Sequence, residues 1–453
     1  MKKSILIIII LVFVFSGLSQ NVAFAASNAP EIIGESAILI DAKNGTVLYA
    51  KDEDALKEPA STTKMMTCLL ALENLRLDQI VTIDAETPFT EGSRVYLIEG
   101  EQITVEHLIY ALMLESANDA AVALAKEISG SVEEFAVLMN KRAKEMGAKN
   151  TTFINPNGLH LEGHNTTAYD LAMIAKTAMQ NPEFRKFVST YAYTIPATNK
   201  QPERFPYNTN RLLYDELTKV PVRGIMTPAK YEGVTGIKTG YTSHAGGCLV
   251  AGAERNGMEL IAVTLKSTDP GRFGDCIAML DYGFENYYSH KAVDASTAIE
   301  DVKVRRGKFN HVAAMIKEDR YLTLPKEAST SLITTKIVMD PSVTAPVKKG
   351  QQIGKIEIYE GSNVVGEVPV MAANAIKKGG LLSVYGIEDS VGAVIKKVVL
   401  TIVCTAVFFF LLILILRIRY VRRRNARRKR RAHEIAKARE RKQRDLEQRR
   451  WPY

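Results

Sequence analysis

The sequence predicts an α+β fold in which an antiparallel sheet packs against a helical subdomain. A small all-β domain, a C-terminal transmembrane helix and a basic tail are predicted to follow. Three observations support this prediction: two hairpin patterns lie far apart in the chain, helical periodicity fills the region between them, and a charge-free apolar run comes shortly before the C-terminus. The 453 residues are too many for one ordinary domain.

The N-terminus has the pattern of a secretion signal. Lys2 and Lys3 precede the apolar run Ile5–Phe15, and Ala23-Phe24-Ala25 supplies small residues before Ala26. This order is typical of a signal peptide that is cleaved after residue 25. An uncleaved N-terminal anchor is the alternative, and both interpretations predict that most of the chain is exported.

Residues 26–290 are predicted to form the first domain. Asn44-Gly45 lies at the centre of Ser36–Asp52, and Asn256-Gly257 lies at the centre of Gly247–Lys266; in both segments apolar strands flank a dipeptide that favours a tight hairpin. Between the hairpins, apolar residues recur at helical spacing in five segments, Thr63–Asn74, Val105–Leu114, Ala120–Ile128, Val132–Met146 and Thr167–Met179.

Residues 295–387 are predicted to form a smaller all-β domain. Short runs rich in Val, Ile and Thr are separated by Gly and Pro, as in Leu332–Met339, Ile353–Tyr359 and Val364–Met371. This region holds none of the candidate catalytic motifs, which indicates a spacer.

Residues 398–416 carry no charge and, as a helix, would be about 28 Å long, close to the thickness of the bilayer hydrocarbon. They predict a membrane span. Residues 417–453 hold 17 Lys or Arg and four acidic residues, so the positive-inside rule predicts a cytoplasmic tail.

The tail carries a net charge of +13, whereas the whole chain carries +9, so residues 26–416 are slightly acidic. A basic segment just below a bilayer favours contact with anionic lipid headgroups rather than with nucleic acid. No nucleic-acid partner is therefore predicted.

Cysteine usage indicates no disulfide framework and no zinc site. Cys404 falls in the predicted span, which leaves Cys68, Cys248 and Cys276 outside it. We interpret these three as small buried apolar residues, with one disulfide left open.

The first motif of chemical interest is Pro59-Ala60-Ser61-Thr62-Thr63-Lys64, which precedes a helical pattern. Ser61 and Lys64 would lie one turn apart on the same face, so an amine would adjoin a hydroxyl. A lysine can take the proton of a serine only if burial or a neighbouring cation lowers its pKa. Taken alone, the motif is also compatible with a solvated helix start.

The second motif is the polar break Glu115-Ser116-Ala117-Asn118-Asp119 between two apolar helical stretches. Polar residues in such a place need partners or a cleft. Taken alone, it is better explained as a helix cap made by Asn118 or Asp119.

The third motif, Lys238-Thr239-Gly240 followed by Tyr241, ends a predicted strand. Such a strand can lie along a peptide substrate, and Gly240 permits close approach of the backbone. Lys238 and Thr239 can bind a carboxylate, and Lys238 is the cation that could depress the pKa of Lys64. An exposed edge lysine that opposes aggregation is the alternative.

Together, Ser61-x-x-Lys64, Ser116-x-Asn118 and Lys238-Thr239-Gly240 resemble the three motifs of penicillin-binding proteins and serine β-lactamases. The finer resemblance is to the low-molecular-mass serine D-alanyl-D-alanine carboxypeptidases, and it spans about residues 30 to 385. It rests on six segments, Pro59–Lys64, Ser116–Ala120, Asn155–Leu159, His164–Asp170, Gly236–Tyr241 and Ala245-Gly246.

This resemblance implies a β-lactamase/transpeptidase-like domain that removes the terminal D-Ala from peptidoglycan pentapeptide stems and binds β-lactam antibiotics covalently. Ser61 would form the acyl-enzyme, with Lys64 as the general base. Ser116 and Asn118 would relay protons and hold the substrate amide. Lys238 and Thr239, beside Gly240, would bind the terminal carboxylate. The backbone N–H groups of Ser61 and Tyr241 would form the oxyanion hole.

The resemblance implies no metal and no other cofactor. His160 and His164 lie four residues apart, but the surrounding Asn, Pro and Gly predict a loop, and the sequence is not His-Glu-x-x-His. His164, Thr166 and Thr167 would instead shape the loop beneath the site. Gly247 replaces a larger residue of many relatives, and His244 and Arg94 are also less usual.

Three other functions are weighed against this one. A class A β-lactamase needs a glutamate for deacylation, and the nearest candidate, Glu162, lacks the usual sequence context. A DD-endopeptidase would use the same motifs and stays open. A non-enzymatic scaffold would be expected to lose Ser61 or Lys64, and both are present.

Overall fold

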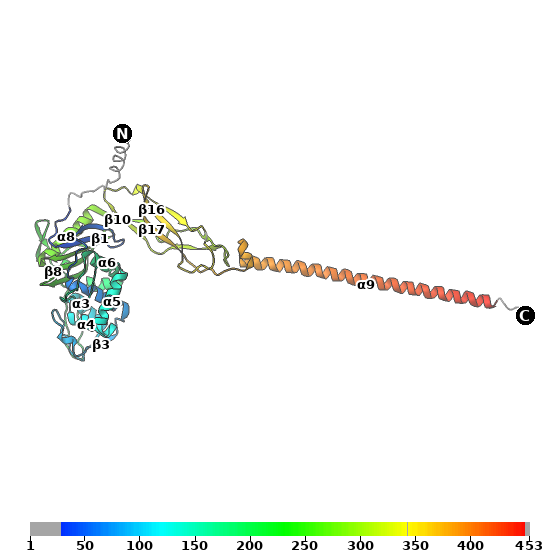
Figure 1. The fold of residues 1–453 in the computed structure, drawn as a ribbon, viewed down its shortest axis with the longest axis horizontal. Coiled ribbons are helices and arrows are strands. Elements are labelled where there is room, and N and C mark those ends of the chain that lie inside the picture. The colour runs from blue at the N-terminus through cyan, green and yellow to red at the C-terminus, as the bar shows by residue number, and fades with distance from the viewer. Residues whose placement is uncertain (1–28, 342, 449–453) are drawn as a thin grey trace, which may run out of the picture. The chain divides into compact units, whose positions relative to one another are not determined.

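The computed structural model describes residues 29–341 and 343–448, so the predicted signal peptide lies outside the described residues. Within this part the contacts define two compact units (Figure 1). The first contains the residues up to Ala292 together with Arg320–Thr330, and the second contains Val293–Asp319 and the residues from Ser331 onward.

The first unit is built on a five-stranded sheet. Neighbouring strands are antiparallel, with Ile38 opposite Val263 and Lys238 opposite Val250. Both predicted hairpins are confirmed, because their strands pair and the turn residues Gly45 and Gly257 have the positive φ that such turns require. The strand order is β2 (Val47–Lys51), β1 (Ser36–Asp41), β9 (Met258–Ser267), β8 (Gly246–Arg255) and β7 (Val234–Thr242).

Both faces of this sheet are buried. Successive side chains of a strand point to opposite faces, so Ile38 and Ile40 join the core shared with the helical region, whereas Leu39 joins a second core. Helix α8 (Asp269–Asn286) supplies Phe273 and much of that second core. This helix was not predicted from the sequence.

The helical region contains all five predicted helices and one more. The additional helix is α7 (Pro182–Ser189), where Asn181 caps the N-terminus by accepting from the backbone N–H groups of Glu183 and Phe184. The others are α2 (Lys64–Asn74), α3 (Val105–Leu114), α4 (Asn118–Ser129), α5 (Val132–Glu145) and α6 (Ala168–Ala178).

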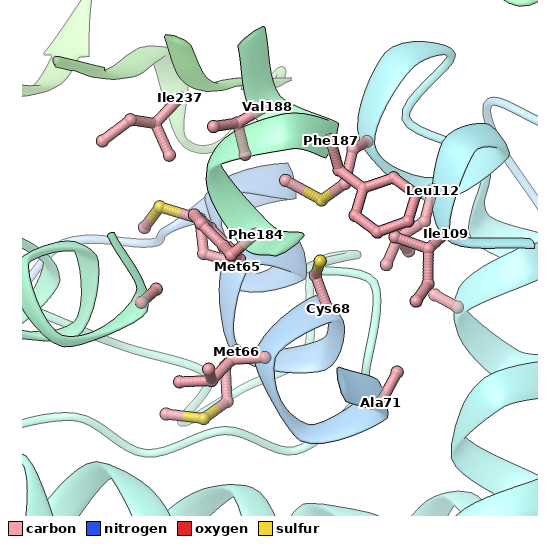
Figure 2. Close-up of a cluster of buried hydrophobic side chains, with 14 of the residues drawn as sticks. Met65, Met66, Cys68, Ala71, Ile109, Leu112, Phe184, Phe187, Val188 and Ile237 are labelled. Atoms are coloured by element: carbon pink, nitrogen blue, oxygen red, sulfur yellow. The ribbon is translucent and has the colours of Figure 1, made fainter. Parts of the chain in front are cut away.

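Helix α2 is deeply enclosed, since its first eight residues, 64–71, are all buried. Figure 2 shows Met65 and Cys68 of α2 among side chains from α3 and α7, including Phe184 and Phe187. Burying each large apolar side chain contributes about 1.5–3 kcal/mol. The position of Lys64 at the start of α2 is therefore set by the hydrophobic core.

Shorter elements complete the first unit. They are η1 (Ala60–Thr63), β3 (Ile80–Thr82), η2 (Thr87–Phe89), β4 (Gln102–Thr104), η3 (Arg211–Leu213), β5 (Lys219–Val222), β6 (Ile225–Pro228), β10 (Tyr287–Val293) and β14 (Arg320–Pro325). Strand β14 pairs with β10, and Thr323 Oγ1 donates to Asp41 Oδ2 at 2.8 Å, which ties this returning segment to β1.

The second unit contains a four-stranded sheet of order β13 (Ala314–Ile316), β17 (Asn363–Ala372), β16 (Gln352–Glu360) and β15 (Ile333–Met339). The three predicted strands of the β-rich region are thereby confirmed. Smaller elements are β11 (Val302–Lys303), β12 (His311–Val312), η4 (Thr330–Leu332) and η5 (Leu381–Tyr385).

Helix α9 runs from Asp389 to Gln448 and contains the predicted span. It is long and apolar enough to cross a membrane, judged by length and composition. It begins before residue 398 and continues through the described part of the basic tail, which is therefore helical.

The three cysteines outside the predicted span are buried, and among the described residues all four cysteines are free thiols. This confirms that they act as small apolar residues and leaves no disulfide in the described chain. Burial raises the pKa of Cys248 to about 11, and it also raises the pKa of Cys68 and Cys276.

Candidate active site

Ser61 and Lys64 lie side by side where η1 leads into α2. Lys64 Nζ is 2.8 Å from Ser61 Oγ. Ser61 is in the 3₁₀ turn rather than in the first turn of the α-helix, and Lys64 is the first residue of α2. The spacing still brings the two groups together, because residues three apart share a face of a 3₁₀ turn.

Lys64 is fully buried, whereas Ser61 is partly exposed. Burial holds the pKa of Lys64 well below its usual value, the positive charge of Lys238 lowers it further, and Asp119 opposes the shift. Burial and a neighbouring cation were both expected from the sequence, and burial is the larger cause. A neutral amine beside a reachable hydroxyl can act as its base.

The loop at residues 155–159 holds the amine from the other side. Lys64 Nζ donates to the carbonyl oxygen of Asn157 at 2.7 Å. Asn155 Oδ1 accepts from the N–H groups of Asn157 and Gly158, at 3.3 and 2.7 Å, which fixes the turn. A Cβ on Gly158 would lie 1.8 Å from the carbonyl oxygen of Ala60, so only glycine fits.

Two residues of the site have left-handed backbone, Ala60 at φ +47° and Ser116 at φ +60°. Such conformations are costly for residues with a side chain, and they are often found at functional sites. Ala60 directly precedes Ser61, and Ser116 lies in the short break between α3 and α4. Ser116 is 8% exposed.

The helix-cap explanation of the second motif is wrong. The N-cap of α4 is Ala117, which makes no side-chain cap bond, and Asn118 and Asp119 lie within the first turn. Asn118 Nδ2 donates to the carbonyl oxygen of Glu91 at 2.6 Å. Asn118 Oδ1 is buried and has no hydrogen-bond partner among the described residues, so it can accept a bond from a ligand N–H.

Asp119 has a supporting position that was not predicted from the sequence. Its carboxylate accepts from the backbone N–H groups of Val95 and Leu97, at 3.3 and 3.1 Å. Burial raises the pKa of Asp119, while these bonds act in the opposite direction. Asp119 thus holds the segment around residues 95–97 next to α4.

Strand β7 brings the segment from Lys238 to Gly240 against Ser61. A Cβ on Gly240 would lie 3.0 Å from the backbone nitrogen of Ser61 and 3.1 Å from the carbonyl oxygen of Pro59. The strand and η1 are therefore in direct backbone contact at Gly240. Such contact is what an oxyanion hole built from the N–H groups of Ser61 and Tyr241 requires.

Lys238 is almost completely buried, and Thr239 Oγ1 lies 2.6 Å from Thr209 Oγ1. Burial, with a contribution from Arg272, lowers the pKa of Lys238 to about 7. A bound carboxylate would favour the protonated ammonium, so this lysine is suited to hold a negatively charged group. Tyr241, next along the strand, is 61% exposed.

Arg272 is a site residue that was missed at the sequence level. It comes from α8, is 8% exposed, and donates through Nη1 to the carbonyl oxygen of Gly240 at 2.7 Å. Its Nη2 pairs with Asp269 at 2.5 Å. No local pattern signals this role, because the contact joins residues 32 positions apart.

His164 is buried against the end of η1, next to Thr63. Its Nδ1 accepts from the backbone N–H of Ile154 at 3.1 Å, so its Nε2 can donate to Thr63 Oγ1 at 3.0 Å. Burial lowers the pKa of His164 to about 4. Both ring nitrogens are therefore occupied in a neutral imidazole, and this histidine is not available to a metal ion.

Comparison with known proteins agrees with the geometry. Residues 23–269 match the family model described as D-alanyl-D-alanine carboxypeptidase, and residues 287–378 match the model of the C-terminal domain of penicillin-binding protein 5. The two matches follow one another along the chain in the same order as the two parts described above.

Individual relatives support both matches. The chain is 36% identical over 356 residues to D-alanyl-D-alanine carboxypeptidase DacF of Bacillus subtilis, which covers 77% of this chain and 87% of the relative. Crystal structures of penicillin-binding protein 5 from Haemophilus influenzae superpose with a TM-score of 0.62 at 31% identity, covering 77% of this chain and 99% of the other.

A third similarity is confined to a smaller part of the chain. A mutant of the DD-transpeptidase of Streptomyces K15 superposes with a TM-score of 0.51 at 34% identity, covering 56% of this chain and 99% of the other.

Proposed function

Because the chain belongs to the D-alanyl-D-alanine carboxypeptidase family of low-molecular-mass penicillin-binding proteins, we propose that Ser61 is the nucleophile of this activity. The protein is a serine-type carboxypeptidase, a hydrolase that acts on the D-Ala-D-Ala end of peptidoglycan stem peptides and binds β-lactam antibiotics. The proposal concerns which residues perform the reaction and how.

Substrate binding would begin with the terminal carboxylate of D-Ala. Lys238 and Thr239 would hold it, since both lie on β7 and Lys238 gains its proton readily when an anion is near. Asn118 Oδ1 would accept a hydrogen bond from an amide N–H of the stem peptide. The scissile carbonyl would then lie next to Ser61, with its oxygen facing the backbone N–H groups of Ser61 and Tyr241.

Acylation would follow from the Ser61–Lys64 pair. The hydroxyl proton of Ser61 passes to the neutral amine of Lys64 as Oγ attacks the carbonyl carbon. The tetrahedral oxyanion is stabilised by the two N–H groups, and Ser116 relays a proton to the departing nitrogen of D-Ala. The ester on Ser61 is then hydrolysed by a water molecule that Lys64 deprotonates, which releases the shortened peptide.

The observation that carries this proposal is the 2.8 Å approach of Lys64 Nζ to Ser61 Oγ with the amine fully buried. A fluorescent penicillin tests it directly. Wild-type protein is expected to be labelled covalently, and Ser61→Ala is expected to lose the label, whereas Ser131→Ala, which changes a helix cap away from the site, should keep it. Labelling that persists in Ser61→Ala would overturn the assignment of the nucleophile.

The balance between carboxypeptidase and endopeptidase action is tested by the products. We expect the protein to convert pentapeptide stems to tetrapeptide stems with release of D-Ala and to leave cross-linked dimers intact. Mass spectrometry of muropeptides before and after treatment distinguishes the two, because cleavage of a cross-link converts dimers to monomers.

We further propose that residues 1–25 are removed as a signal peptide and that residues 26–290 and 295–387 are the extracytoplasmic domains. Residues 398–416 would cross the plasma membrane once, with residues 417–453 in the cytoplasm. The support is the apolar stretch of α9 and the basic residues that follow it.

Removal of the predicted membrane span tests whether this span is what holds the protein in the membrane. It also tests whether the active site works without it. Protein that ends before Val398 is expected to be soluble and to release D-Ala from a diacyl-D-Ala-D-Ala peptide at a rate within about twofold of the full chain, because every proposed site residue lies before residue 273. Folded but inactive truncated protein would contradict the expectation.

A further inference from the structure

Glu58, His160 and His244 form a cluster of metal-binding side chains that the reaction above does not use. One ligand atom from each lies within 4.8 Å of those of the other two, and among the described residues no other group of three His, Cys, Asp or Glu side chains meets this criterion. His160 Nδ1 is 2.9 Å from Glu58 Oε1. The rings of His160 and His244 meet edge to face with centroids 3.9 Å apart.

We propose that these three residues form a binding site for a divalent first-row transition metal ion, with Zn²⁺ the best fit. Two imidazole nitrogens and one carboxylate are a donor set that Zn²⁺ prefers, and three protein ligands leave a fourth position for water. Donors around a tetrahedral ion with bonds of about 2.0–2.2 Å lie about 3.3–3.6 Å apart. The hydrogen-bonded atoms of His160 and Glu58, now 2.9 Å apart, would therefore separate by about half an ångström when an ion enters.

This site differs from the histidine pair that the sequence argued against. That pair was His160 with His164, and His164 is buried with both ring nitrogens bonded to protein. His160 and His244 are instead exposed, and Glu58 is partly buried. An ion can therefore reach the cluster from solvent by displacing the proton shared between His160 and Glu58.

The three ligands come from three separate segments of the proposed active site. Glu58 stands three residues before Ser61, His160 follows the loop whose Asn157 carbonyl holds Lys64, and His244 follows β7 and the proposed oxyanion donor Tyr241. The backbone at Glu58 already contacts β8, because the carbonyl oxygen of Glu58 lies 3.7 Å from Cys248 Sγ. A bound ion would thus clamp the nucleophile, the base-holding loop and the substrate strand at the rim of the site.

Titration with Co²⁺ and Zn²⁺ tests the proposal on the full chain in detergent micelles, purified without a histidine tag and treated with EDTA. We expect one Co²⁺ to bind per chain with visible absorption bands, and Zn²⁺ to displace it. His160→Gln and His244→Gln are each expected to weaken binding at least about tenfold, because each removes a ligand. His311→Gln, an exposed histidine of the second unit, is the matched control.

Two further measurements distinguish binding at this cluster from binding elsewhere on the chain. Zn²⁺ should raise the Tm of the wild type but not that of His244→Gln, since only a ligand bound to the folded state stabilises it. Ser61→Ala should bind the ion as the wild type does, so the result does not depend on the catalytic assignment. Labelling with fluorescent penicillin confirms that the histidine variants are folded.

No saturable site in the wild type would overturn the proposal. Equal affinity in the wild type, His160→Gln and His244→Gln would also overturn it, because the ion would then be bound elsewhere, for example at His433 in the tail.

Discussion

The two sides of the active site are held in place by different forces. The nucleophile side, η1 and α2, is embedded in the hydrophobic core, and every residue from 64 to 71 is buried. The substrate side is β7, the last strand of the sheet, which pairs with β8 along its length and adds Ile237 to the same core. At Gly240 it is held in addition by the bond from Arg272 and by close backbone packing against η1. Core packing thus positions the proposed base, whereas the proposed carboxylate-binding strand depends also on sheet pairing and on the charged bond from Arg272.

This difference predicts separate kinetic effects. A substitution on the nucleophile side that keeps the buried volume should strongly lower the rate of acylation and leave the fold intact. A substitution on the substrate side should mainly weaken substrate binding and so raise KM.

The largest expected effect is that of Lys64→Met. Methionine keeps an apolar stem of similar length in the buried site but removes the base, so acylation by penicillin should fall by about 10²–10⁴-fold. Stopped-flow or gel-based labelling rates measure it. Lys141→Met, on the exposed surface of α5, is the matched control and should label at the wild-type rate. An unchanged rate in Lys64→Met would show that another group accepts the Ser61 proton.

Arg272→Met tests the substrate side. Loss of its charged hydrogen bond to the Gly240 carbonyl should cost about 1.5–3 kcal/mol and raise KM for a diacyl-D-Ala-D-Ala peptide about 10- to 100-fold, with a smaller change in kcat. Arg255→Met, at the far end of β8, is the control. A fall in kcat at constant KM would mean that Arg272 acts on the reacting groups rather than on the binding strand.

The pH dependence sharpens the comparison further. Lys238 must carry a proton to bind a carboxylate, and its pKa lies at about 7, so kcat/KM should fall as the pH rises above about 7. Lys238→Arg keeps its charge at much higher pH. The fall in kcat/KM should therefore occur at a higher pH in this variant, even if its maximal rate is lower. If kcat/KM fell at the same pH in both proteins, a group other than Lys238 would control this pH dependence.

The last prediction concerns the stability of the nucleophile side, through His164, and not the rate of reaction. Its pKa is lowered from 6.5 to about 4 in the folded protein, so the neutral form is favoured by folding. The resulting stability is fully present above pH 6.5 and is lost as the pH falls toward 4, by at most about 3 kcal/mol.

Thermal unfolding at several pH values measures this loss. His164→Gln should show a weaker fall in Tm between pH 6.5 and 4 than the wild type, and His311→Gln should behave as the wild type does. An equally steep fall in His164→Gln would show that other groups control acid stability.

The sequence predicted the elements whose signals are local. The Asn-Gly turns identified both hairpins, and apolar periodicity identified five helices almost to the residue. Helix α4 begins two residues earlier than predicted, because Asn118 and Asp119 resemble capping residues but lie inside the first turn. Helix α8 was missed because it is buried around most of its circumference, so polar and apolar residues do not alternate along it with a clear helical period.

For the site, the motif residues were identified from their order and from the resemblance, but their supports were not. The bond from Arg272 to Gly240 and the carboxylate of Asp119 beneath residues 95 and 97 join distant segments. The left-handed backbone of Ala60 has no sequence signal either, since alanine does not favour that conformation. Such features follow from the tertiary fold and not from local pattern.

The buried cysteines have a practical consequence for preparing this enzyme. Within the described residues, Cys68, Cys248 and Cys276 are unpaired and enclosed, so the stability of the first unit requires no oxidising compartment. The catalytic part should fold equally well in a reducing cytosol, and mild thiol reagents or oxidants should not inactivate it while it stays folded.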